Sequence, residues 1–316
     1  MGKAFADSSA AARELFEEVD EVLGQSLSRL MFEGPADELT LTANAQPAIM
    51  AASLAALRVL EREAGILLAD KAAFVAGHSL GEYSALAAAG SLALADTAGL
   101  LRLRGEAMQA AVPPGEGAMA AILALPIQEV QAIAAEAAAG KGLAAEAAAG
   151  EVTAAEAAAG EVLAVANDNA PGQVVVSGAK AAVERAILLA KSRGARHTVL
   201  LPVSAPFHCP LMRPAAEAME RALAETTIRA PVVPLYANVT AAAVSDPADI
   251  RRLLVAQVTG TVRWRESVEA MAAAGVDTMV ELGGKVLGPM VKRIAPGIRN
   301  LSVQKPDDID ALLQAL

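Results

Sequence analysis

The chain has few of the residues from which disulfides and metal centres are built. Its 316 residues include one cysteine and three histidines. The single cysteine, Cys209, has no partner for an internal disulfide. The histidines, at positions 78, 197 and 208, are too scattered to match the ligand spacing of a zinc or iron site. The sequence therefore predicts no metal centre and no cofactor.

Long apolar runs and an excess of positive charge are also absent. No stretch approaches the roughly 20 uninterrupted apolar residues of a membrane span, and Met1 is not followed by the basic region and apolar core of a secretion signal. The formal net charge of -10 argues against a nucleic-acid surface, because phosphate binding needs a basic face. These absences predict a cytoplasmic protein that binds neither membrane nor nucleic acid.

Apolar residues are abundant, and alanine is the commonest of them. Hydrophobic residues make up 54% of the sequence, which is ample for a large buried core. Strand-like and helix-like segments alternate before and after residues 118–202. We predict an α/β fold in which residues 1–117 and 203–316 form a hydrolase-like core with a parallel sheet. Residues 118–202 are predicted to be an inserted smaller domain.

The inserted segment has a pattern of its own. It predicts a strand, a helix, two strands, a helix and a strand, which is the β-α-β-β-α-β series of a ferredoxin-like domain. At 134–163 the unit Ala-Ala-Glu-Ala-Ala-Ala-Gly occurs three times with a period of ten residues. Each repeat ends in glycine and does not complete a whole number of helical turns, so we predict a broken surface helix without an active role. We interpret the repeat as a tandem duplication that a surface loop tolerates; the alternative interpretation is an arm that binds a partner.

A nucleophile motif lies between the apolar run 72–76 and the helix-prone run 82–89. Residues 77–81 read Gly-His-Ser-Leu-Gly, a G-x-S-x-G pentapeptide. A serine hydroxyl attacks a carbonyl only when it projects from a tight strand-to-helix turn toward an open site and a base. The glycines relieve the crowding of such a turn, and the N–H of Leu80 points to where an oxyanion would develop. The pattern predicts Ser79 as a nucleophile.

Three histidines are candidates for its base. His78 adjoins Ser79 on the tight turn, so its ring should point elsewhere. His197 stands at the start of a predicted strand and should be a surface residue. His208 lies in a proline-bracketed loop between a strand and a helix, where catalytic side chains are often carried. We predict His208 as the base.

A hydrolase of the common α/β type also has an acid between its serine and its histidine in sequence. None of the acids between Ser79 and His208 stands at the end of a predicted strand, which disfavours an ordinary hydrolase. A backbone carbonyl can hold the Nδ1–H of the imidazole instead and leave Nε2 to accept the serine proton.

Arg104 follows the elbow on the next predicted helix. A solvated charge is the ordinary interpretation of such an arginine. If it points into the site instead, its planar fork can bind a carboxylate with two hydrogen bonds and select an acyl group that has a free acid at its far end.

Five motifs follow one another along the chain at compatible spacing. They are Gly-His-Ser-Leu-Gly-Glu-Tyr at 77–83, Arg-Leu-Arg-Gly at 102–105, Asn-Asp-Asn-Ala-Pro-Gly-Gln at 167–173, Phe-His-Cys-Pro-Leu-Met at 207–212 and Gly-Lys-Val-Leu at 284–287. Together they resemble the malonyl-CoA:acyl-carrier-protein transacylases of fatty acid synthesis, a family of acyltransferases. The likeness covers essentially the whole chain except the duplications.

The resemblance implies ping-pong acyl transfer. Ser79 would attack the thioester of malonyl-CoA, CoA would leave, and the phosphopantetheine thiol of acyl carrier protein would collect the malonyl group. His208 matches the base of the family, Arg104 its carboxylate clamp, and Leu80 one of its oxyanion donors.

Two further positions gain a role from the same likeness. Gln257 matches a residue whose backbone carbonyl steadies the histidine in this family. Phe207 is similar to a bulky residue of malonyl-selective relatives, where it would crowd an α-methyl branch on the acyl group. Both positions agree with the selectivity that Arg104 suggests.

The start of the chain departs from the family pattern. Family members begin with a strand and a Gly-Gln-Gly-type loop whose glutamine supplies the second oxyanion N–H. Met1 stands about where that loop should already have ended, so the comparison predicts that this strand and this donor are missing. Gln46 is not expected to replace the donor. Losing one oxyanion donor costs about 2.7–4 kcal/mol.

Two other functions share parts of the pattern. A serine thioesterase or esterase has the same elbow but passes the acyl group to water. A truncated remnant would bind CoA or carrier protein with little turnover. Nothing in the sequence indicates oligomerisation, so we predict a monomer.

Overall fold

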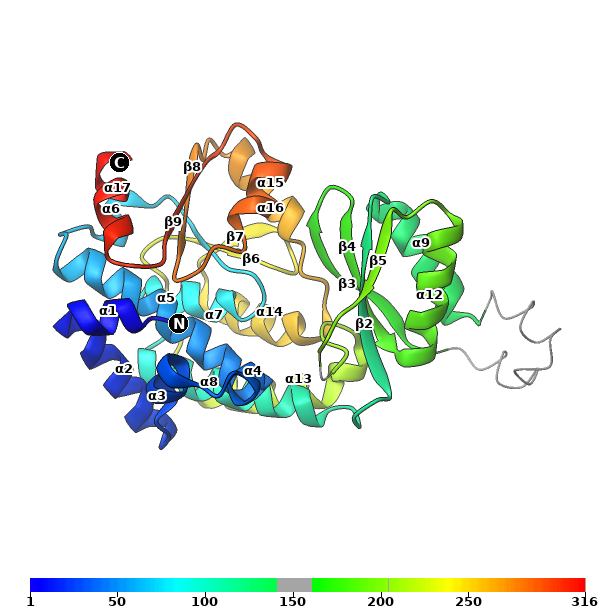
Figure 1. Ribbon diagram of the computed structural model, residues 1–316, viewed down its shortest axis with the longest axis horizontal. Helices are drawn as coiled ribbons and strands as arrows, with labels where there is room; N and C mark the ends of the chain where they lie inside the picture. The colour runs from blue at the N-terminus through cyan, green and yellow to red at the C-terminus, as the bar shows by residue number, and fades with distance from the viewer. Residues whose placement is uncertain (141–160, 204, 316) are drawn as a thin grey trace. The chain divides into compact units, whose positions relative to one another are not determined.

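The computed structural model describes residues 1–140, 161–203 and 205–315 of the chain, which Figure 1 shows as ribbons. Two compact units are formed: one from Met1–Glu106, Ala218–Leu253 and Ser267–Leu316, the other from Ala107–Glu217 and Leu254–Glu266. The predicted small domain, residues 118–202, lies within the second unit, which also takes in residues on either side and the segment 254–266. The division into a core of residues 1–117 and 203–316 and a small domain of residues 118–202 stays a prediction.

Helices make up the first part of the first unit. They are α1 (Lys3–Ser8), α2 (Ala10–Leu23), α3 (Leu27–Glu33), α4 (Ala36–Thr40), α5 (Thr42–Arg62) and α6 (Leu68–Lys71). Ser9 caps α2 by accepting the N–H of Ala12 at 3.1 Å, and Gly24 ends it in the left-handed conformation. Leu15 and Val19 of α2 are buried, and Figure 1 shows α1, α2 and α5 packed side by side.

Helix α5 contains a proline in its interior: it begins at Thr42 and passes through Pro47. Proline lacks the N–H that would bond to the carbonyl of Ala43, which costs helix stability. Tertiary contacts compensate: Asn44 accepts a hydrogen bond from Nη1 of Arg102 at 2.7 Å and donates one to the carbonyl of Glu38 at 2.9 Å. The turn before the proline is therefore held from outside the helix.

Short strands form the sheets of the first unit. β1 (Val75–Ala76) pairs in parallel with β6 (Leu235–Ala237), and β6 pairs antiparallel with β7 (Ala242–Val244). A separate parallel pair joins β8 (Thr278–Leu282) to β9 (Arg299–Val303). Both of these parallel pairs agree with the predicted parallel sheet, whereas the hairpin strand β7 was not predicted. The earliest described strand is β1, and the predicted loss of an N-terminal strand and loop stays a prediction.

The remaining helices continue the alternation. They are α7 (Gly81–Ala88), α8 (Leu94–Ala110), the 3₁₀ turn η1 (Pro210–Met212), α13 (Arg213–Glu225), α14 (Pro247–Thr259), α15 (Trp264–Ala273), α16 (Gly288–Ile294) and α17 (Asp307–Ala315). The motif at 284–287 leads into α16, where the Glu281 carboxylate accepts the N–H groups of Leu287 and Gly288, each at 3.0 Å. Within the described ranges, no helix is both long and apolar enough to cross a membrane.

The second unit contains a four-stranded antiparallel sheet. Its elements are β2 (Gly117–Leu123), α9 (Ile127–Ala138), β3 (Leu163–Ala170), β4 (Gln173–Ala179), α12 (Lys180–Ser192) and β5 (His197–Leu200), with strand order β3-β4-β2-β5. Figure 1 shows α9 and α12 on one face, where Ile122, Ile133 and Val183 are buried together. This is the ferredoxin-like topology that the sequence predicts. Of the repeats at 134–163, residues 141–160 lie outside the described residues.

The edge strand β3 is covered by the segment that follows α14. The N–H of Val262 donates to the carbonyl of Ala166 at 2.9 Å, and the N–H of Asp168 donates to the carbonyl of Val262 at 2.9 Å. The Asp168 carboxylate is 1% exposed, and its Oδ2 lies 2.9 Å from Nε and 2.8 Å from Nη2 of Arg265. The backbone of segment 261–265 is thus tied to β3.

We expect Asp168→Ala to lower the free energy of unfolding by about 3 kcal/mol, because it leaves the Arg265 cation next to a buried site without its carboxylate. The matched control is Glu129→Ala in the same unit. It removes a partly exposed pair at 2.9 Å from Arg193, which keeps Glu136 as a partner, and should cost less than about 1 kcal/mol. Urea unfolding of both variants checks this, and equal losses would contradict it.

Candidate active site

The serine of the G-x-S-x-G motif lies on a sharp turn between β1 and α7. Ser79 has a φ of 54°, in the left-handed region that non-glycine residues rarely occupy. A Cβ added at Gly77 would lie 2.0 Å from the carbonyl carbon of Gly81, so the turn closes only with glycine there. Strained backbone of this kind costs about 1–3 kcal/mol and is typical of functional sites.

A residue from the end of β6 holds this turn. Oδ1 of Asn238 accepts the N–H of Ser79 at 2.7 Å, and Nδ2 donates to the carbonyl of Gly77 at 2.8 Å. The N–H of Asn238 donates to Oε2 of Glu82 at 3.1 Å. The sequence analysis missed Asn238, because it is 159 residues from Ser79 and no local motif marks it.

Arg104 of α8 points to the serine. Its side chain is 1% exposed, with Nη2 3.1 Å from Oγ of Ser79 and Nη1 2.7 Å from Oε1 of Gln46. Its guanidinium carbon lies 5.8 Å from the centre of the Tyr83 ring, within cation–π range. Burial lowers the pKa of Arg104 and raises that of Tyr83. The guanidinium is thus a buried cation within hydrogen-bond distance of the predicted nucleophile.

A close contact between two helices brings Arg104 to this position. A Cβ added at the neighbouring Gly105 would lie 2.6 Å from both the Cα of Ala43 and the carbonyl oxygen of Thr42. The backbones of α8 and α5 therefore meet at this glycine, with Gln46 one turn further along α5. Gln46, which the sequence analysis gave no role, orients the guanidinium.

The predicted base is held in the second unit. Nδ1 of His208 lies 2.9 Å from the backbone carbonyl oxygen of Gln257, and both residues are buried. Since a carbonyl only accepts, the Nδ1–H donates and Nε2 is left as the proton acceptor in the neutral ring. His208 also has a positive φ, 56°. The contact between His208 and Gln257 exists as the resemblance implies, and its catalytic role stays a prediction.

The loop that carries His208 packs against the sheet of its own unit. A Cβ added at Gly117 of β2 would lie 2.4 Å from the ring of Pro206, so a glycine admits the proline there. Phe207 packs against Met119, Ala166 and Val175. The Sγ of the buried Cys209 donates to the carbonyl of Pro206 at 3.1 Å, and burial raises the pKa of this thiol, so it stays protonated and is a poor nucleophile.

The other predicted residues take simpler places. Leu80 is the N-cap residue of α7, directly after Ser79. His78 is half-buried on the turn, and His197 is exposed at the start of β5. In the described ranges, no cluster of three or more histidine, cysteine, aspartate or glutamate side chains is placed to bind a metal ion.

Known proteins match the chain closely over its whole length. The family model described as an acyl transferase domain matches residues 1–137. The malonyl CoA-acyl carrier protein transacylase of Bacillus subtilis (strain 168) is 43% identical and aligns over 100% of this chain and 92% of its own length. The chain belongs to the malonyl CoA-acyl carrier protein transacylase family.

Solved structures support the same assignment. The acyl-carrier-protein-S-malonyltransferase of Bartonella henselae is 50% identical, with a TM-score of 0.90 over 100% of this chain and 94% of that one. A malonyl-transacylase in complex with its type II PKS acyl-carrier protein is 35% identical, with a TM-score of 0.90 over 100% of this chain and 95% of that one. The family predicted from five motifs is confirmed, and so is the fold: a hydrolase-like α/β core with a ferredoxin-like small domain. This transacylase-family chain is an acyltransferase.

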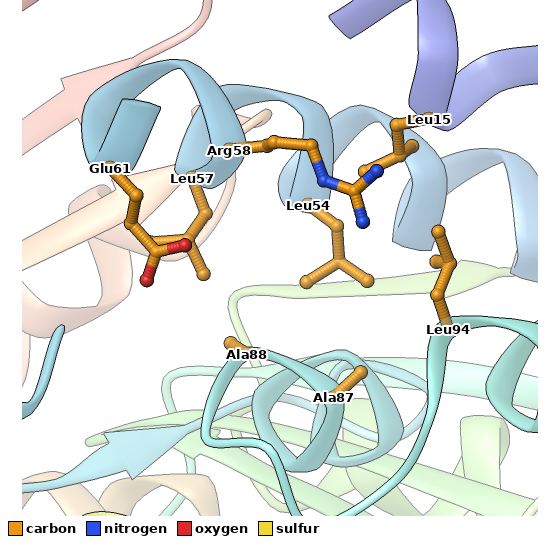
Figure 2. Close-up of a pocket in the computed structure, with 8 residues that line it drawn as sticks. All are labelled: Leu15, Leu54, Leu57, Arg58, Glu61, Ala87, Ala88 and Leu94. Carbon is orange, nitrogen blue, oxygen red and sulfur yellow. The ribbon is translucent and has the colours of Figure 1, made fainter. Parts of the chain in front are cut away.

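One pocket of this transacylase-family chain lies away from the serine. It lies between α2, α5, α7 and the start of α8, as Figure 2 shows. Its volume is about 150 Å³. Its lining is apolar except for one cation and one carboxylate: Leu15, Leu54, Leu57, Arg58, Glu61, Ala87, Ala88 and Leu94. Burial raises the pKa of Glu61, and the nearby Arg58 opposes this rise. The pocket touches the end of α7 that is farther from Ser79, so it is not where an acyl group on that serine would lie.

Gly105→Ala should destabilise the first unit by about 1–3 kcal/mol, because the added methyl group forces α8 away from α5. Gly99→Ala is the matched control on the same helix. A Cβ there meets nothing within 4 Å, so the higher helix propensity of alanine should leave stability unchanged or raise it by up to about 1 kcal/mol. The urea midpoints of the two variants should therefore move in opposite directions; a fall of the same size in both would count against the helix contact.

Proposed function

We propose that this chain transfers a malonyl group from malonyl-CoA to the phosphopantetheine thiol of acyl carrier protein through an acyl-enzyme on Ser79. The observation that carries the proposal is the buried guanidinium of Arg104 at 3.1 Å from Oγ of Ser79. The hydrogen bonds described above for this guanidinium go to neutral oxygens, those of Gln46 and Ser79. A carboxylate on the acyl group would accept two hydrogen bonds from the planar fork of this guanidinium.

In the first half-reaction, Nε2 of His208 accepts the Ser79 proton while Oγ forms a bond to the thioester carbonyl carbon. The carbonyl oxygen becomes an oxyanion that accepts the N–H of Leu80. When this intermediate collapses, the bond from carbon to the CoA sulfur breaks, and the imidazolium returns its proton to the leaving thiolate. The malonyl group is then an ester on Ser79, and His208 is neutral again.

In the second half-reaction, His208 removes the proton from the phosphopantetheine thiol, and the sulfur attacks the ester carbonyl. Collapse breaks the bond between the acyl carbon and Oγ, and the imidazolium reprotonates Ser79. The proposal requires the two units to present their groups to the same acyl carbon. Gln257 fixes the tautomer of His208, because its carbonyl accepts the Nδ1–H.

The choice of acyl group and of acceptor follows from the same site. Arg104 selects an acyl group with a free carboxylate, and Phe207, beside the base, disfavours a branch at the α-carbon. The related malonyl-transacylase in complex with its acyl-carrier protein supports a carrier protein as the acceptor. A serine thioesterase shares the elbow but gives the buried guanidinium no task. The predicted monomeric state and cytoplasmic location stay predictions.

Arg104→Ala should lower kcat/KM for malonyl transfer by about 10²-fold or more, because two hydrogen bonds to a charged group are lost. Transfer of acetyl, which has no carboxylate, should change far less. Arg104→Lys serves as the matched variant, because it keeps the charge without the planar fork and should recover only part of the malonyl rate. The measurement is transfer of each acyl group to holo-acyl carrier protein, and equal losses for both groups would rule out the clamp.

His208→Ala should slow formation of the malonyl-enzyme by about 10²–10⁴-fold, because the serine loses its general base. The check is the rate of CoA release in the first turnover, with the mass of the Ser79 peptide followed in parallel. His197→Ala, at an exposed position, should acylate normally. Normal labelling of Ser79 in the His208 variant would remove the imidazole from the mechanism.

A further inference from the structure

Asn238 contacts the nucleophile turn on both sides of the serine. It is 1% exposed, and its single planar amide accepts the Ser79 N–H at 2.7 Å and donates to the Gly77 carbonyl at 2.8 Å. These two backbone groups flank His78, so one side chain spans the first half of the turn. The side-chain amide thereby makes the two hydrogen bonds that a neighbouring strand's backbone would make if the β-ladder continued.

The register of the sheet explains why this residue is available there. Val75 of β1 pairs with Leu235 of β6, and Ala76 pairs with Tyr236. The chain of β1 then turns sharply into α7, so the backbone groups of the turn cannot continue the ladder. Asn238, two residues beyond Tyr236, supplies side-chain partners instead. Without Asn238, the Ser79 N–H and the buried Gly77 carbonyl would each lose a hydrogen bond, at a cost of about 0.5–1.5 kcal/mol each.

The helix after the serine fixes Asn238 in turn. The Asn238 N–H donates to Oε2 of Glu82 at 3.1 Å, and Glu82 is 1% exposed. Glu82 lies in the first turn of α7, where the helix dipole favours a carboxylate. The Asn238 amide bonds to the turn, the Asn238 N–H bonds to Glu82, and Glu82 belongs to the helix that follows Ser79. These linked contacts hold Ser79 at its φ of 54°.

We propose that Asn238 and Glu82 are positioning residues for acyl transfer, which together hold the Ser79 hydroxyl and the adjacent Leu80 N–H in attacking geometry. This inference rests on the proposed role of Ser79 as the nucleophile. Neither side chain touches the reacting atoms in this role. A displacement of about 1 Å at a reacting group costs on the order of 10²-fold in rate, so the effect of losing the amide should fall on the acylation step.

The test uses Asn238→Ala in the full-length chain. Two readouts are measured: the rate constant of CoA release in the first turnover with malonyl-CoA, and the rate of Ser79 sulfonylation by phenylmethanesulfonyl fluoride, followed by mass spectrometry. Both rate constants should fall by about 10²-fold. The Kd of malonyl-CoA, from the concentration dependence of the first turnover, should change less than about threefold, because binding contacts to the substrate remain. A normal rate constant, or a loss confined to Kd, would overturn the proposal.

Two further variants test the carboxylate and separate positioning from general loosening of the fold. Glu82→Ala removes the acceptor of the Asn238 N–H and should slow both rate constants, as Asn238→Ala does; normal rate constants would remove Glu82 from the proposal. Ala243→Gly weakens the exposed hairpin strand opposite Tyr236 without touching the amide, and should leave both rate constants unchanged. If Ala243→Gly slows acylation as much as Asn238→Ala does, the role is merely structural and the proposal fails.

The sulfonylation readout keeps this inference distinct from the malonyl-transfer proposal. A wild-type chain that is sulfonylated at Ser79 but releases no CoA would contradict malonyl transfer, and the sulfonylation rates of the variants would still decide the role of Asn238. A wild-type chain with no reactive Ser79 would overturn both. If Asn238→Ala does not fold, as circular dichroism will show, Asn238→Ser replaces it. Its hydroxyl cannot reach both Ser79 and Gly77, so the same loss is expected.

Discussion

The left-handed backbone of Ser79 is the constraint on which the rest of the site depends. A strand that turns directly into a helix projects one side chain outward, and that residue takes a positive φ at a cost in strain. Within the turn, glycine at position 77 avoids a collision that any side chain would make with Gly81. Asn238, far away in the sequence, stabilises the turn further, because its amide bonds to the Ser79 N–H and the Gly77 carbonyl, which lie beyond the β1–β6 ladder.

The position of the Arg104 guanidinium depends on a close contact between the backbones of two helices. At Gly105 the backbones of α8 and α5 come within contact distance, and this places Arg104 where it reaches both Gln46 and Ser79. Burial makes the cation costly, as the lowered pKa of Arg104 indicates. A carboxylate on an acyl group would accept two hydrogen bonds from this guanidinium, and the proposed selectivity for malonyl rests on that interaction.

In the second unit, glycine contacts and a backbone hydrogen bond likewise position the imidazole of His208. A ferredoxin-like sheet carries the loop of His208, with Gly117 admitting Pro206 and an apolar cluster holding Phe207. Gln257 of α14 supplies a neutral backbone acceptor for Nδ1, where many serine enzymes use a carboxylate. The segment after α14 is tied to β3 through Val262 and the Asp168–Arg265 pair. The backbone carbonyl of Gln257 therefore fixes the Nδ1 side of the imidazole.

The sequence by itself determined the elements with strong local patterns. The β-α-β-β-α-β series and the elbow at Ser79 follow from periodicity and glycine spacing, which act over a few residues. The five motifs identified the family for the same reason. Only the tertiary structure decided that α5 passes through Pro47, that Arg104 is buried, and that Gln46 and Asn238 reach the serine turn. Each of these depends on contacts between residues far apart in the chain, where packing and hydrogen bonding outweigh local propensity, and a local pattern carries no record of such contacts.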